Sequence, residues 1–161
     1  MTAKTLKIAT HFVDKYAHVW RWDDEYSITE KPLPCTVFVQ KVLKTELGRK
    51  LTTLERSRIN IILPLLTFQR LVREGDFRVS GVVYAIVKGG LGRQVPLSRA
   101  KPGHYCQFWI NGKGHSCIVH HIEGDQMWYI SSNKSTHGPG VGGPIQLKER
   151  RNKRIWLAEL K

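Results

Sequence analysis

The chain has 161 residues, a length typical of one folded domain with a sizeable core. It is 41% hydrophobic and 24% charged, and no run approaches the ~20 apolar residues that a membrane-spanning helix needs. Lys and Arg number 26 against 13 Asp and Glu, so the net charge of +13 predicts a polyanionic partner: nucleic acid, acidic lipid or an anionic cell-wall polymer.

The N-terminus and the cysteine count bear on the compartment. Residues 1–7 lack the apolar core of a secretory signal peptide, so we expect synthesis in the cytoplasm without export by that route. The chain has three cysteines, and an odd number argues against a disulfide framework and fits a reducing compartment.

The first half of the chain predicts helices. The clearest begins at Cys35, where apolar residues follow at helical spacing until Leu47, and Gly48 is the expected C-terminal stop. The other expected helices are one within residues 5–22, one opened by a capping box of Thr52 and Glu55, one after Pro64 within 61–74, and one at 79–87 that stops at Gly89, for which a strand is the alternative.

The second half predicts an antiparallel meander. Asn111-Gly112 is a strong hairpin signal between expected strands at 104–110 and 115–122. A turn at 123–125 leads into a strand at 126–132, a Gly- and Pro-rich loop is expected at 137–144, and a last strand at 155–160. Helices followed by antiparallel strands predict one α+β domain over residues 1–161.

Cys35 is the candidate nucleophile. Pro32 and Pro34 hold the approach to it extended. The unpaired backbone N–H groups at the start of its helix then favour a thiolate over a thiol. The alternative is a small buried thiol that only packs in the core.

A cysteine nucleophile needs a base and a group that orients the base. His115 is the candidate base, because it starts a strand whose face lies over the apolar face of the preceding strand. If the next turn has three residues His115 lies opposite Asn133, and if it has two, opposite Ser132; either side chain can bond an imidazole. The alternative is that His115 is a polar residue at the rim of the sheet.

Residues 34–39, 100–109, 114–116 and 129–138 together resemble papain-like NlpC/P60-type hydrolases. The resemblance is closest to the branch of peptidoglycan amidases, including toxins delivered between bacteria. It implies N-terminal helices packed on an antiparallel sheet, and a triad of a cysteine that opens a helix, a histidine that starts a strand and a polar residue on the next strand. These positions match Cys35, His115 and Asn133, with Ser132 and Ser131 as alternates for the third, and Tyr26 as the counterpart of a tyrosine that helps the oxyanion hole.

The same resemblance implies a function. It is that of a cysteine peptidase or amidase, without a cofactor, that cleaves amide bonds in peptidoglycan or muropeptides. A toxin of this kind would reach the periplasm or a target cell by a specialised secretion route, and an immunity protein that inhibits it would be its partner.

A zinc site is a first rival. His104, Cys106, His115 and Cys117 fall on one face of the hairpin and are all zinc-competent. The strand rise spreads such ligands about 7 Å apart along each strand, so we expect no metal. Cys106 and Cys117 are expected to pack in the sheet, or to pair as a disulfide if the chain works outside a cytoplasm.

A basic nucleic-acid-binding module without catalysis is the second rival. It would use the positive charge together with exposed aromatic side chains for base stacking. No recognisable binding motif supports it, and nucleic acid is not the expected partner. The aromatic candidates are Trp20, Trp22, Trp109, Trp128 and Tyr129.

Overall fold

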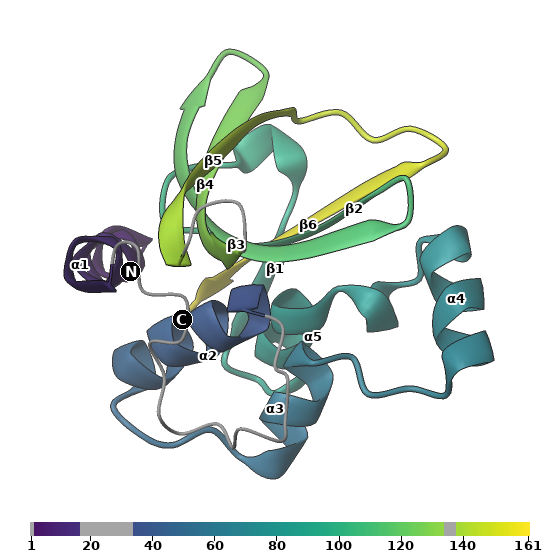
Figure 1. Cartoon of the computed structure of the whole chain (residues 1–161), viewed down its shortest axis with the longest axis horizontal. Coiled ribbons are helices and arrows are strands. Elements are labelled where there is room, and N and C mark those ends of the chain that lie inside the picture. Colours follow the sequence, from purple (N-terminus) through teal and green to yellow (C-terminus); the bar gives the residue numbers. More distant parts are fainter. Residues whose placement is uncertain (1, 17–33, 134–137) are drawn as a thin grey trace.

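The computed structural model describes residues 2–16, 34–133 and 138–161. In this part of the chain an antiparallel sheet of six strands carries α2, α3 and α5 on one side, and α4 stands at one end (Figure 1). The strand order is β1-β6-β2-β3-β4-β5. The helices are α1 Thr2–Tyr16, α2 Pro34–Leu47, α3 Thr53–Ile59, α4 Leu65–Glu74 and α5 Gly81–Lys88, with 3-10 turns η1 Phe77–Val79 and η2 Leu97–Arg99; the strands are β1 Gly92–Val95, β2 Tyr105–Ile110, β3 Lys113–Glu123, β4 Gln126–Asn133, β5 Gly138–Gln146 and β6 Lys153–Leu160.

The α+β class and the helices predicted from local signals are confirmed. The helix that carries Cys35 ends at Leu47, and Gly48 follows it with a φ of +66°, a value that favours glycine. Thr52 and Glu55 form the predicted capping box at the start of α3. The segment 79–87, with strand as its alternative, is helical as α5.

Two strands depart from the sequence prediction. Residues 137–144 were expected to be a loop, but from Gly138 onward they form β5, which pairs with β4. β5 lies at the edge of the sheet, where prolines are tolerated because the outer row of N–H groups needs no partner. The short strand β1 was not predicted; it pairs with β6 over four residues.

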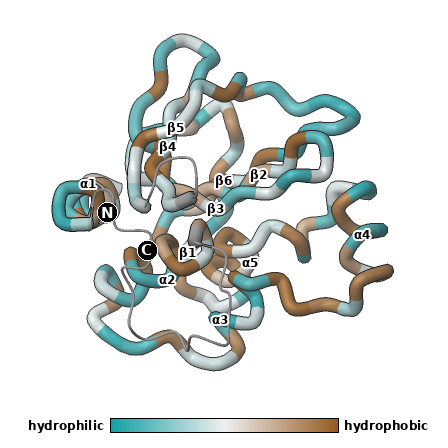
Figure 2. The backbone as a smooth tube through the Cα atoms, in the orientation of Figure 1, coloured by the Kyte–Doolittle hydropathy of each residue, from teal (hydrophilic) through white to brown (hydrophobic). Residues whose placement is uncertain are grey.

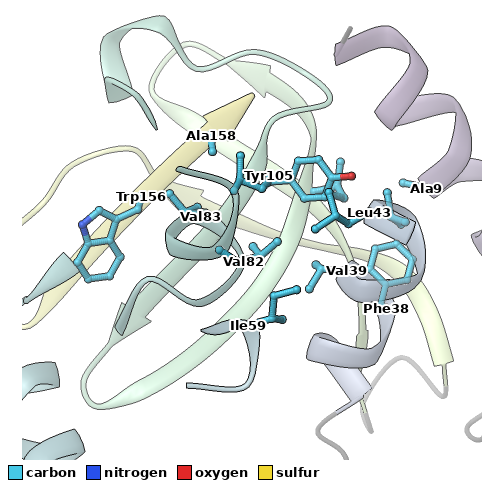
Figure 3. Packing of buried hydrophobic residues seen from close by; sticks show 14 of the residues in the cluster. Ala9, Phe38, Val39, Leu43, Ile59, Val82, Val83, Tyr105, Trp156 and Ala158 are labelled. Carbon is cyan, nitrogen blue, oxygen red and sulfur yellow. The ribbon is translucent and has the colours of Figure 1, made fainter. Parts of the chain in front are cut away.

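The sheet separates two apolar clusters. The larger fills the space between the sheet and the helices, and Figure 3 shows Phe38, Val39 and Leu43 of α2 packed near Tyr105 of β2. We call this side of the sheet the helix face. The smaller cluster, which includes Cys106, Phe108, Cys117 and Met127, covers the opposite side, which we call the far face. β2, β3, β4 and β6 therefore bury apolar residues on both sides.

Glu46 of α2 ties three elements together inside the helix-face core. Its carboxylate accepts hydrogen bonds from Thr5 Oγ1 of α1 and from Tyr105 Oη of β2, each at 2.8 Å. Burial, followed by the nearby Glu46 carboxylate, raises the pKa of Tyr105 well above its ordinary value, so the phenol keeps its proton and donates it. The bonds fix α2, and with it Cys35, against the sheet.

None of the helices in the described ranges is both long and apolar enough to cross a membrane.

Candidate active site

Cys35 lies in the first turn of α2 and is 8% exposed. Three backbone N–H groups, those of Ser116, Thr36 and Cys35 itself, lie near its sulfur and act to lower the pKa of the thiol. Two of these groups belong to the helix start, where the first N–H groups have no partner within the helix. The third comes from β3, so the thiol lies where the helix start meets the sheet.

The pKa of the Cys35 thiol is raised, because burial outweighs the three N–H groups that lower it. The sequence predicted that the helix start would favour a thiolate. The N–H groups act in that direction, but the low-polarity surroundings cost the charged form more. The resting cysteine is therefore a neutral thiol.

A local opening of the sheet explains why the N–H of Ser116 is free to bind sulfur. The backbone N–H and C=O of Val119 bond to residues 103 and 104 on the β2 side, so by alternation those of Ser116 point toward β4. The β3–β4 pairing begins only at Ile118 and Ile130. At Ser116, side chains replace the backbone of β4: the Cys35 sulfur lies near the N–H, and Ser131 Oγ donates to the carbonyl at 2.7 Å.

The His115 ring lies on the far face of the sheet. Its centroid is 5.6 Å from that of Phe108 and 5.5 Å from that of Tyr129. The next side chain, Ser116, projects to the helix face, where its hydroxyl donates to Gln107 Oε1 at 2.5 Å. Burial lowers the pKa of His115 to about 4, so the imidazole is neutral at pH 7. Among the described residues its Nε2 has no hydrogen-bond partner.

The structure brings the Cys35 thiol to the strand of His115 but does not join the two side chains. Cys35 Sγ lies near the N–H of the residue next to His115, and Cys35 and His115 line one cavity. No hydrogen bond links the thiol to the ring in the described part of the chain. His115 also lines a second cavity, on the far face, with Phe108, Asn111, Lys113 and Tyr129.

The cavity beside Cys35 has a volume of about 250 Å³. Its lining comes from α2, from the stretch between the end of α3 and α4, and from the β2–β3 hairpin. The apolar lining residues are Ile59, Ile61, Leu63, Leu65, Phe68 and Trp109, and the others are Cys35, Thr36, Asn60, Gln107, Gly114, His115 and Ser116.

The β3–β4 register differs from both registers considered from the sequence. The β3–β4 turn has two residues, Gly124 and Asp125, because Glu123 pairs with Gln126. One extra residue in β3, His120, then shifts the register, and Ile118 pairs with Ile130. The pairing ends at Ile118, so His115 has no partner on β4 and the third triad residue stays a prediction.

The side chain of Asn133 and the whole of Tyr26 lie outside the described residues. The alternates are described. Ser131 is buried and uses its hydroxyl on the Ser116 carbonyl, while Ser132 is buried with no partner for its hydroxyl among the described residues.

Ile61 is a residue of the cavity that the sequence did not single out. It has a φ of +53°, in the left-handed region that a β-branched residue rarely adopts. The N–H of Ile61 bonds to Arg58 O and that of Ile62 to Ser57 O, which is the pattern of a Schellman motif at the end of α3. Glycine is the usual residue at this position, so an isoleucine here costs about 1–3 kcal/mol.

The described residues contain no group of three or more His, Cys, Asp or Glu side chains arranged to hold a metal ion. Of the four hairpin residues considered for zinc, His104 is turned toward β6, with its Nε2 3.5 Å from Glu159 Oε2. Cys106 and Cys117 pair directly opposite each other and are free, fully buried thiols.

The aromatic side chains considered for nucleic-acid stacking are occupied within the fold where they are described. Trp109 donates its indole N–H to Val79 O at 2.8 Å, Tyr129 packs on His115, and Trp128 stacks on His121 with ring centroids 4.5 Å apart. Trp20 and Trp22 lie outside the described residues.

No family model, curated protein or solved structure matches the chain.

Proposed function

We propose that this protein is a cysteine hydrolase of amide bonds, with Cys35 as its nucleophile. One observation carries the proposal: the Cys35 sulfur lies at a helix start, under three backbone N–H groups, and opens into a cavity that His115 also lines. A thiol that served only to fill the core would need neither the N–H groups nor the cavity.

In the proposed reaction His115 removes the thiol proton as Cys35 Sγ attacks the amide carbonyl carbon. Both groups are neutral at rest, so proton transfer accompanies the attack instead of preceding it. The N–H groups that face the sulfur then stabilise the negative carbonyl oxygen. The C–N bond breaks, His115 gives the proton to the leaving amine, and water hydrolyses the thioester.

The imidazole has to turn from Phe108 and Tyr129 toward the thiol for this step. Its Nε2 has no hydrogen bond to break among the described residues. Because the ring lies on the far face and Cys35 on the helix face, the step also requires the start of β3 to move and the ring to leave Phe108 and Tyr129. Catalytic hydrogen bonds are often long in a free enzyme and tighten when substrate binds. Asn133, on the strand that follows β3, is the proposed orienting residue.

The proposal includes a papain-like, NlpC/P60-type architecture and peptidoglycan as the substrate. The order of a cysteine at a helix start, a histidine early in a strand and a polar residue on the next strand supports it. The net charge of +13 would hold an anionic cell-wall polymer near the site. Delivery to the periplasm or to a target cell, and an immunity protein as partner, belong to the same proposal.

Digestion of purified peptidoglycan tests the reaction. We expect wild type to release fragments detectable by mass spectrometry, and Cys35→Ala to release none. His115→Ala should lower the rate at least 100-fold, the contribution usual for a general base. Thr10→Ala, at an exposed position of α1, serves as a control that keeps full activity. Equal release by wild type and Cys35→Ala would remove Cys35 as the nucleophile.

A further inference from the structure

We propose that Ile62, Leu65 and Leu66, at the junction of α3 and α4, dock this protein on the surface of an anionic lipid bilayer without crossing it. We call these three residues the apolar tip. The inference goes beyond the proposed hydrolase and does not depend on it, because it concerns where the protein binds and not which bond it cleaves. Figure 1 shows α4 at one end of the molecule, and Figure 2 shows the hydrophobic colouring of the stretch that leads into it.

The apolar tip gathers exposed hydrocarbon in one short stretch. Five large hydrophobic side chains are exposed in the described part of the chain, and three of them lie within residues 62–66. Ile62 is 70% exposed, Leu65 68% and Leu66 79%. Single exposed hydrophobic residues are normal on a folded protein, whereas a cluster of them marks an interaction site.

The packing of α4 leaves the apolar tip outside. The helix turns other apolar residues inward: Leu71 is fully buried, and the Phe68 ring meets that of Trp109 edge to face, with centroids 5.4 Å apart. Leu66 and Arg70 are four residues apart, so they share another side of the helix, and both are exposed. The solvent side of α4 therefore begins with leucine and continues with arginine.

The charge of the surrounding sequence is exclusively positive. Residues 56–73 contain no Asp or Glu, and their charged side chains are Arg56, Arg58, Arg70 and Arg73. The flanking acids are already paired, since Glu55 lies 2.7 Å from Arg49 and Glu74 lies 4.0 Å from Arg70. Aliphatic side chains accompanied by arginines complement a surface on which anionic head groups cover hydrocarbon.

Charge and composition decide between the occupants. A second copy of the chain would bring together two molecules of net charge +13, which repel each other. Protein interfaces are enriched in aromatic residues and methionine, and leucine is uncommon among the residues that dominate them. The apolar tip has only leucine and isoleucine, so a bilayer fits it better than an acidic protein does.

Flotation with lipid vesicles tests the proposal. The probes are vesicles of phosphatidylcholine alone and vesicles in which about one lipid in three is phosphatidylglycerol, mixed with the full-length protein at low salt. We expect binding to the second kind only. Leu66→Ser should weaken it about 10-fold, because one leucine no longer enters hydrocarbon. Arg70→Gln should weaken it about 5-fold, through the loss of one positive charge near the anionic surface.

The controls are matched in chemistry and lie on other elements. Val141→Ser removes an exposed aliphatic side chain from β5, and Lys7→Gln removes an exposed positive charge from α1. Ile62→Ser is a second variant of the apolar tip. Leu65 is left unchanged, because it also lines the cavity beside Cys35, whereas Ile62 and Leu66 do not. All the substituted side chains are exposed, so the variants should fold, which circular dichroism checks.

Binding to anionic vesicles that falls with Leu66→Ser, Ile62→Ser and Arg70→Gln more than with the two controls supports the proposal. Binding that Leu66→Ser and Val141→Ser leave equal to that of wild type reflects net charge alone and overturns the apolar tip as the docking surface. Absence of vesicle binding also overturns it, and an acidic protein then becomes the better occupant.

Discussion

At the scale of single residues, the site is built from neutral groups. Burial raises the pKa of the Cys35 thiol and lowers that of the His115 imidazole to about 4, so both shifts disfavour charge. A preformed thiolate–imidazolium pair would need the opposite shifts. In the proposed reaction the base acts during the attack, and the N–H groups around the sulfur stabilise charge only as it develops.

The pKa of His115 predicts how stability depends on pH. An unfolded histidine has a pKa near 6.5, so between pH 6.5 and 4 the unfolded chain binds more protons than the folded one. Stability therefore falls as the pH is lowered through this window. By pH 4 we expect wild type to have lost about 3 kcal/mol through this residue. Urea unfolding at pH 7 and pH 4 measures the loss.

His115→Gln is the matched variant for this measurement, since it cannot take up the proton. The lowered pKa of His104, which burial causes first, is common to both proteins and cancels in the comparison. An equal acid loss in wild type and His115→Gln would contradict the buried neutral imidazole.

Cys106 and Cys117 are expected to form a disulfide when the chain refolds with a small-molecule disulfide as oxidant. They lie opposite each other in a hydrogen-bonded strand pair, where Cα atoms are about 5.5 Å apart, within the range of disulfides. The loop they close predicts a gain of up to about 3 kcal/mol in unfolding free energy. Peptide mapping detects the cross-link, and Cys35→Ala should form it equally. A cross-link through Cys35 instead would contradict the assignment.

At the scale of elements, the placement of α2 against the sheet depends on one buried carboxylate. Glu46 accepts from the hydroxyls of Thr5 and Tyr105, which come from α1 and β2. Because the first turn of α2 carries Cys35, the same bonds hold the thiol at β3.

Glu46→Ala removes the acceptor that the hydroxyls of Thr5 and Tyr105 share. We expect a loss of about 2–4 kcal/mol in unfolding free energy, because the buried Tyr105 hydroxyl left without this acceptor costs about 1–3 kcal/mol and the lost bond from Thr5 about 1 kcal/mol. Tyr105→Phe removes only one donor and should cost about 1 kcal/mol. Chemical denaturation measures both, and a smaller loss for Glu46→Ala than for Tyr105→Phe would refute the shared role.

At the scale of the whole molecule, the positive charge lies outside the cavity beside Cys35, so electrostatic binding of a polymer and contacts within the cavity are separate interactions. The net charge of +13 acts through solvent and is screened by salt, whereas the cavity beside Cys35 has no Asp, Glu, Lys or Arg among its described lining residues.

Binding of Cys35→Ala to purified peptidoglycan should therefore weaken several-fold between low salt and 0.5 M sodium chloride, because the screening length falls from about 30 Å at 0.01 M to about 3 Å at 1 M. Co-sedimentation measures this binding. Salt-independent binding of peptidoglycan would contradict the electrostatic role.

The sequence by itself determined the helices, their ends and the hairpin. Gly48, the Thr52–Glu55 capping box and Asn111-Gly112 act through contacts within a few residues, so their effect can be read locally. The pairing of β5 with β4, the existence of β1 and the strained turn at Ile61 depend on partners distant in the chain or on the cavity, and only the tertiary structure decided them.

For the candidate site, too, the sequence decided some features and only the tertiary structure decided others. The sequence marked Cys35 at a helix start and His115 early in a strand, and both lie there. It could not decide whether His115 and Cys35 lie on the same side of the sheet, because the side that the helices cover depends on packing between segments distant in the chain. Nor could it give the direction of the Cys35 pKa, since desolvation is a property of the surrounding fold and not of the helix start alone.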